Sequence, residues 1–217
     1  ASDKVGDCKV DWLRDEPKGG WTLTLKDTDG KLLRRFIDTN GDNRPDVWSY
    51  FKDGVEVYRE IDTTFTGTPD QYRWLNAGGS KWGIDEARDL HIKSWKVLSP
   101  EELSQEVLAA LATRDFARFQ ALLLSDAEMK ALDLPAAEAA RIQAAQKEAK
   151  AKFDDAVTKL PALTPKAVWQ YLQTDVPHCL PADQTGSRLD LIAHTRGTIV
   201  FTPEKGDVGM IQTGELI

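Results

Sequence analysis

Residues 37–48 read IDTNGDNRPDVW, and this stretch places oxygen-bearing side chains at alternate positions. The loop offers five oxygen groups, which are the side chains of Asp38, Asn40, Asp42 and Asp46 and the backbone carbonyl of Arg44. A hard cation such as Ca²⁺ prefers several oxygen ligands at about 2.3–2.6 Å. Asn43 stands where such loops turn sharply, and Asn tolerates a positive φ better than most residues. The stretch therefore predicts a calcium-binding loop.

The same loop has an interpretation without metal. Asp and Asn side chains accept hydrogen bonds from their own backbone two residues on, so an Asx-rich turn explains the composition as well. Against this, three carboxylates held close together disfavour one another's ionisation, and a cation removes that penalty. We therefore expect Ca²⁺ at Asp38, Asn40, Asp42, Arg44 and Asp46, where its role would be structural.

The pattern repeats along the N-terminal part of the chain. Ile37-Asp38 returns as Ile61-Asp62 and again as Ile84-Asp85, at spacings of 24 and then 23 residues. Each loop leads to an aromatic strand, as expected of repeated supersecondary units. The later loops lose charge, because they carry Thr64 and Thr66 or Lys93 where the first loop has oxygen ligands. Only loop 38–46 is therefore predicted to bind metal.

Turn signals divide the repeat into strands. Asp29-Gly30 and Asp53-Gly54 each separate two segments rich in branched and aromatic residues, which is a strong hairpin signal. Residues 21–97 are predicted to form an antiparallel meander of about seven strands.

Six of the seven tryptophans lie in the N-terminal part of the chain, at positions 12, 21, 48, 74, 82 and 95. Aromatic side chains on a pleated face pack across strands and bury large areas, so the simplest interpretation is a hydrophobic core. The alternative is an exposed platform that binds a carbohydrate or peptide ligand.

The rest of the chain predicts helices followed by strands. Ser99-Pro100 and Ser125 begin helices with capping signals, and an Ala-rich helix is expected over 135–160. A further helix is expected from Thr164 to Leu172, followed by three short strands. The predicted fold class is α+β, with an N-terminal β-hairpin repeat, central helices and a small C-terminal antiparallel sheet. The predicted domains are 1–97 and 98–217.

Composition excludes several classes of function. The net charge of −7 argues against a nucleic-acid partner, whose phosphates would be repelled. No apolar run approaches the roughly 20 residues that span a bilayer, so no transmembrane segment is expected. The chain opens with Ala1-Ser2-Asp3 rather than Met, which we interpret as a processed, extracytoplasmic protein.

Two cysteines, Cys8 and Cys179, leave three interpretations open. An even count in an exported protein predicts a Cys8–Cys179 disulfide. The alternatives are two buried thiols, or a thiol-dependent enzyme in which His194 activates Cys179. His178 is a poor base for Cys179, because adjacent residues usually point apart.

The DxNGDxxxD spacing of loop 38–46 resembles the calcium loops of FG-GAP and thrombospondin type 3 repeats. The stretches VWSYFKDGVEVYREID and DQYRWLNAGGSKWGID, with WKVLSPEEL after them, resemble an uncharacterised family of secreted planctomycete proteins. That resemblance implies an exported repeat protein and supplies no activity.

Together these observations predict a non-catalytic, calcium-stabilised interaction or scaffold protein with a protein partner, as part of a surface or envelope assembly. The alternatives are a ligand-binding module that uses the tryptophan-rich sheet, and the thiol-dependent enzyme at Cys179.

Overall fold

The structure is a computed structural model that describes residues 7–15, 19–76 and 79–217. The chain divides into two compact units, Ala1–Ser99 and Pro100–Ile217. The start at residues 1–3, which motivated the expectation of processing, lies outside the described residues. Each unit is described by itself below.

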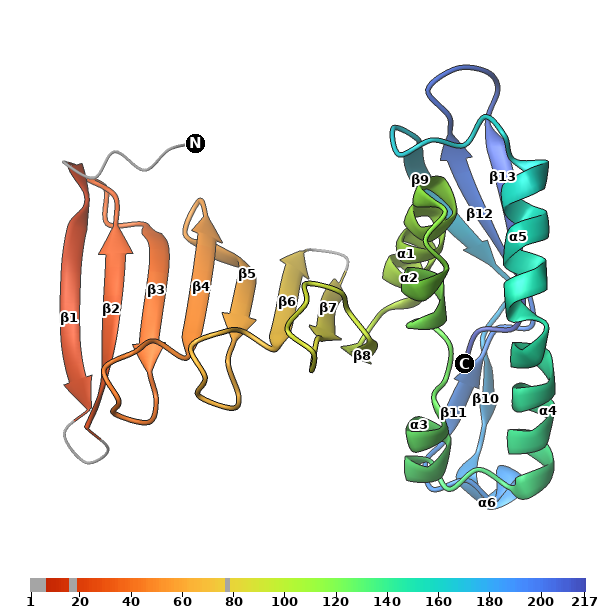
Figure 1. The fold of residues 1–217 in the computed structure, drawn as a ribbon, viewed down its shortest axis with the longest axis horizontal. Coiled ribbons are helices and arrows are strands. Elements are labelled where there is room, and N and C mark those ends of the chain that lie inside the picture. Colours follow the sequence, from red (N-terminus) through yellow and green to blue (C-terminus); the bar gives the residue numbers. More distant parts are fainter. Residues whose placement is uncertain (1–6, 16–18, 77–78) are drawn as a thin grey trace. The chain divides into compact units, whose positions relative to one another are not determined.

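The N-terminal unit is an eight-stranded antiparallel meander in which every strand pairs with its neighbour in the chain. Figure 1 shows the strands side by side in chain order, in a single layer. The strands are β1 (Lys9–Asp15), β2 (Gly20–Lys26), β3 (Leu32–Asp38), β4 (Val47–Lys52), β5 (Val55–Ile61), β6 (Gln71–Asn76), β7 (Gly79–Ile84) and β8 (Ser94–Val97). The predicted meander is confirmed, with β1 as a strand that the turn signals did not include.

Strand register sorts the side chains of this sheet onto two faces, because directly opposite residues share a face. The aromatic face carries a row of rings, Tyr50, Tyr58, Trp74 and Trp95. The arginine face carries the alternating positions of the same strands, chiefly Arg35, Ser49, Arg59, Arg73 and Trp82.

Contacts between rings cross the aromatic face from strand to strand. Tyr50 and Tyr58 lie 5.6 Å apart between centroids, and Tyr58 and Trp74 are also 5.6 Å apart. Trp74 and Trp95 follow at 6.0 Å. Aromatic pairs at such distances contribute about 0.5–1.5 kcal/mol each beyond their buried area. Of the six tryptophans, only Trp21 is buried, so the expectation that the stripe forms an enclosed core is wrong for the others.

The C-terminal unit combines helices with two small antiparallel sheets, of order β13-β12-β9 and β10-β11. Its helices are α1 (Pro100–Thr113), α2 (Phe116–Gln120), α3 (Asp126–Ala131), α4 (Ala136–Lys147), α5 (Ala149–Lys159) and α6 (Ala182–Thr185). Its strands are β9 (Val168–Thr174), β10 (His178–Leu180), β11 (Leu191–Ala193), β12 (Gly197–Thr202) and β13 (Gly209–Thr213). The predicted α+β class is confirmed.

The buried hydrophobic cluster lies in this unit, between α1, α5 and the three-stranded sheet. Ile199 of β12 and Ala110 of α1 are completely buried there. Phe153 of α5 is also buried, and its ring meets Phe116 edge-on at 5.4 Å. Ser125 forms the predicted capping box at the start of α3, since it exchanges hydrogen bonds with Glu128.

Two helix predictions are wrong. The segment expected as a helix from Thr164 to Leu172 ends in strand β9, because Val168, Trp169 and Tyr171 are branched or aromatic and pair with β12. The Ala-rich helix over 135–160 is divided at Glu148 into α4 and α5. None of the helices in the described ranges is long and apolar enough to cross a membrane.

Candidate functional site

Five aspartates are buried at the ends of strands in the N-terminal unit. Each exposes 6% or less of its surface, although Asp is rarely buried without a partner. They are Asp38, Asp46, Asp62, Asp70 and Asp85. They occupy equivalent positions of the three repeated loops, 38–46, 62–70 and 85–93. These three loops are here called the aspartate loops.

Asp38 fixes the first aspartate loop through backbone amides. Its Oδ1 accepts from the Asn40 amide at 3.2 Å and from the Gly41 amide at 2.7 Å. Its Oδ2 accepts from the Asn43 amide at 2.9 Å. Charge-assisted hydrogen bonds of this kind are stronger than neutral ones, so the loop closes around the carboxylate.

Asp62 plays the same part in the second loop. It accepts from the Thr64 amide at 3.2 Å and from the Gly67 amide at 2.5 Å. Burial alone would raise the pKa of Asp62, but the amides of Gly67 and Thr64 and the Thr64 hydroxyl together hold it below its usual value. The carboxylate therefore remains charged in a buried position.

The third loop also begins with an aspartate, Asp85, but it ends with Lys93 where the first two loops end with an aspartate. Asp85 accepts from the amides of Asp89, at 3.3 Å, and Leu90, at 2.8 Å. Lys93 replaces the closing aspartate and forms an ion pair with Asp89 at 3.1 Å. The conformation of the loop thus depends on its first aspartate.

The closing aspartates of the first two loops bind threonine. Asp46 accepts from the Thr39 amide and hydroxyl, both at 2.7 Å. Asp70 accepts from the Thr63 amide at 3.1 Å and from its hydroxyl at 2.7 Å. Each pair ties the two ends of its loop together.

All three loops place a left-handed residue at the third and at the fifth position after the first aspartate. These residues are Gly41 and Asn43, Phe65 and Gly67, and Arg88 and Leu90. A positive φ is a genuine outlier for a bulky residue, so surrounding contacts must hold Phe65, Arg88 and Leu90 there. The positive φ predicted at Asn43 is confirmed.

Backbone hydrogen bonds join each aspartate loop to the next. The Asp62 amide donates to the carbonyl of Asp46 at 2.8 Å, and the Asp85 amide donates to the carbonyl of Asp70 at 2.8 Å. Arg88 adds a side-chain link, because it donates to the hydroxyl of Thr64. The loops therefore form a continuous hydrogen-bonded edge across β3 to β7.

The side chains predicted to bind calcium accept hydrogen bonds from backbone amides of their own loop. Both oxygens of Asp38 face amides, Asp42 is exposed and accepts from the Arg44 amide at 2.7 Å, and Asn40 accepts from the Asp42 amide at 2.9 Å. Across the described ranges, no three Asp, Glu, His or Cys side chains form a group that could hold a metal ion. Loop 62–70 has an equivalent hydrogen-bond pattern around Asp62, with Thr64 and Thr66 at the positions of Asn40 and Asp42.

The cysteines lie in different units. Cys8 is half-buried ahead of β1, and Cys179 is exposed in β10. The structure contains no disulfide between them, so it does not support the predicted pairing. His194 binds the carbonyl of Asp175 through Nδ1 at 3.2 Å.

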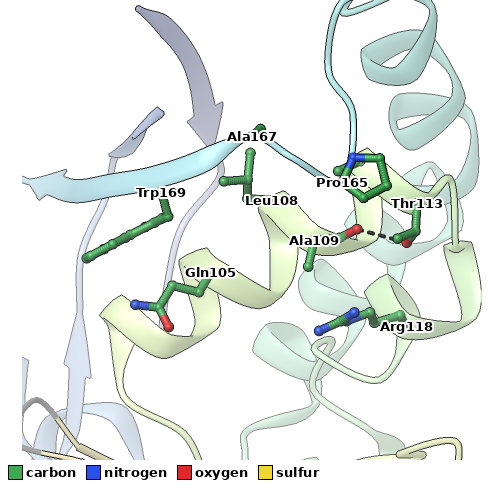
Figure 2. Close-up of a pocket in the computed structure, with 9 residues that line it drawn as sticks. Gln105, Leu108, Ala109, Thr113, Arg118, Pro165, Ala167 and Trp169 are labelled. Atoms are coloured by element: carbon green, nitrogen blue, oxygen red, sulfur yellow. Dashed lines mark hydrogen bonds between the residues drawn. The ribbon is translucent and has the colours of Figure 1, made fainter. Parts of the chain in front are cut away.

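A cavity of about 310 Å³ lies in the C-terminal unit. Figure 2 shows Leu108 and Ala109 on one side of it and Trp169 on another, with Arg118 at its edge. Arg118 forms an ion pair with the buried Glu106 at 2.6 Å. The Arg118 guanidinium is therefore already paired with a carboxylate. The other lining residues are mostly apolar, so the cavity is mainly an apolar gap between α1 and β9.

The arginine face was not among the features predicted from the sequence. Arg35, Arg59 and Arg73 lie in β3, β5 and β6, at alternating positions that point the same way. The 24-residue period could have indicated this face, because Arg35 and Arg59 are 24 residues apart, as are Ser49 and Arg73, and so occupy equivalent positions of the repeat. Alternation along each strand then places such residues on one face of the sheet.

Comparison of the chain with protein-family models, with curated proteins and with solved structures finds no match. The resemblance to secreted planctomycete proteins and to FG-GAP or thrombospondin type 3 loops therefore stays a prediction.

Asp38→Ala should destabilise the N-terminal unit by about 2–3 kcal/mol in EDTA, because it leaves three backbone amides without their charged acceptor. Asp42→Ala is the matched control and should cost about 0.5 kcal/mol or less, since Asp42 is exposed. Urea unfolding followed by tryptophan fluorescence measures both, because six of seven tryptophans lie in this unit. Equal effects would contradict the role given to Asp38.

Calcium binding by loop 38–46 also stays a prediction. Millimolar Ca²⁺ should raise the melting temperature above that in EDTA, because a ligand that binds only the folded state stabilises it. Asp42→Ala should remove the rise, and Thr66→Ala, at the equivalent position of the second loop, should not. Identical wild-type melting curves in Ca²⁺ and EDTA would refute calcium binding.

Proposed function

We propose that the protein is a non-catalytic interaction or scaffold protein whose N-terminal sheet carries the binding surface. One observation carries the proposal. The described residues of the N-terminal unit form a single-layer sheet, and within that unit no helix or second sheet lies over either face. A sheet of this kind presents both faces for recognition, whereas most sheets bury one face against a second layer.

The aromatic face supports recognition of a partner or ligand. Tyr50, Tyr58, Trp74 and Trp95 are half-buried, so their rings keep accessible area. Cations lie at both ends of the row, with Arg34 over Tyr50 at 5.1 Å and Lys81 over Trp95 at 5.6 Å. Rings that are fixed before binding lose little conformational entropy, which favours affinity.

The aspartate loops supply rigidity to this surface. They hold the strand ends in register along one edge, so that rows of side chains from five strands stay aligned. An extracytoplasmic location and a structural Ca²⁺ in loop 38–46 belong to the same proposal, because extracellular fluids hold calcium at concentrations that weak loops can use.

Envelope fragments offer a test of this function. The wild-type protein should co-sediment with purified bacterial envelope fragments, and Trp74→Ser should reduce the bound fraction severalfold because it removes the centre of the aromatic row. Circular dichroism would confirm that the variant remains folded.

Tyr171→Ser is the matched control, since Tyr171 is an aromatic residue of the C-terminal unit with 51% of its surface exposed. It should leave co-sedimentation unchanged. No co-sedimentation of the wild type, or an equal loss in both variants, would overturn the proposal.

A further inference from the structure

We propose that the arginine face of the N-terminal sheet binds an acidic polysaccharide with about one carboxylate per sugar. This inference rests on the proposed function only in using the N-terminal sheet as the binding surface. The arginine face lies opposite the aromatic row, and the ligand proposed for it is an acidic polysaccharide.

Cations extend across the arginine face in one line. Arg35 lies in β3, Arg59 in β5 and Arg73 in β6, and register places Arg59 directly opposite Arg73. Lys96 of β8 continues the line, since its ammonium lies 4.1 Å from the centre of the Trp82 ring on this face. With neighbouring strands about 4.8 Å apart, the four charges span about 24 Å.

Two of these charges act on one carboxylate, because burial would raise the pKa of Glu56 but Arg59, and more weakly Arg35, lower it. Arg59 binds Glu56 through two hydrogen bonds of 2.8 and 2.6 Å. Arg35, Arg73 and Lys96 form no ion pair with the residues that the structure describes. Arg73 lies directly opposite Arg59 in the sheet, and because it forms no such pair its charge is open to a bound anion.

The same face supplies rings beside the cations. The Arg35 guanidinium lies over Phe51 at 5.6 Å, and that of Arg73 lies over Trp82 at 4.8 Å. Arg73 is also held by a hydrogen bond from its Nε to the Ser80 hydroxyl at 2.9 Å. The rings and the Ser80 hydroxyl thus orient the guanidinium groups for a carboxylate.

Charge density favours a polysaccharide over a nucleic acid. Duplex DNA carries a negative charge about every 1.7 Å of its axis. The cations of the arginine face are much more widely spaced, and the chain as a whole has a net charge of −7. A polymer with one carboxylate per sugar matches the sparse row with less repulsion from the rest of the protein.

Calorimetric titration with an oligogalacturonate at low salt tests the assignment on the full chain. Wild-type protein should bind, and high salt should weaken the affinity, because the contacts are charged. Arg35→Gln and Arg73→Gln should each raise Kd about tenfold, as expected for the loss of one charge-assisted hydrogen bond. Arg196→Gln is the matched control, since Arg196 is an exposed arginine of the C-terminal unit, outside the N-terminal sheet.

Melting curves show whether each variant is folded, and Arg35→Lys and Arg73→Lys, which keep the charge, should retain most of the affinity. The assignment is overturned if the wild type does not bind, if Arg196→Gln weakens binding as much as Arg35→Gln, or if a single-stranded oligonucleotide binds more tightly. Failure here with intact, Trp74-dependent envelope binding would refute only the ligand class. Loss of both would refute the proposed function as well.

Discussion

Hydrogen bonds from backbone amides to buried aspartate carboxylates hold the N-terminal unit together. Asp38, Asp62 and Asp85 each bind amides of the following residues, and this interaction forces the positive φ angles within each loop. Removal of one carboxylate takes away the charged acceptor of these amides. The register of the strands, and thus both faces of the sheet, depends on this arrangement.

A single-layer sheet cannot gain stability by burying a face against another layer within its own unit. Here the faces are stabilised by contacts within the layer, with rings from adjacent strands in contact and cations over those rings. Long side chains cover apolar surface with their stems while their charged ends stay in water. The side chains that stabilise the sheet are therefore also accessible to a ligand, and structure and recognition share the same residues.

Local patterns in the sequence predicted most of the fold. The Asp-Gly turns and the 24-residue period predicted the meander, and Ser125 predicted a capping box, because each signal acts within a few residues. The strand β9 was missed because Thr164-Pro165 looks like a helix start, whereas pairing with β12, more than 20 residues away, decides its structure. The arginine face was missed for a related reason, since only the register between strands aligns Arg59 with Arg73.

Native-state amide hydrogen exchange tests most directly whether the aspartates organise the loops. The amides of Gly41, Asn43, Gly67 and Leu90 donate to buried carboxylates, so they should exchange as slowly as amides in the middle of the sheet. This protection should persist in EDTA, because protein carboxylates supply it. Exchange of these four amides at the rate of exposed loops, while the strands remain protected, would contradict the account.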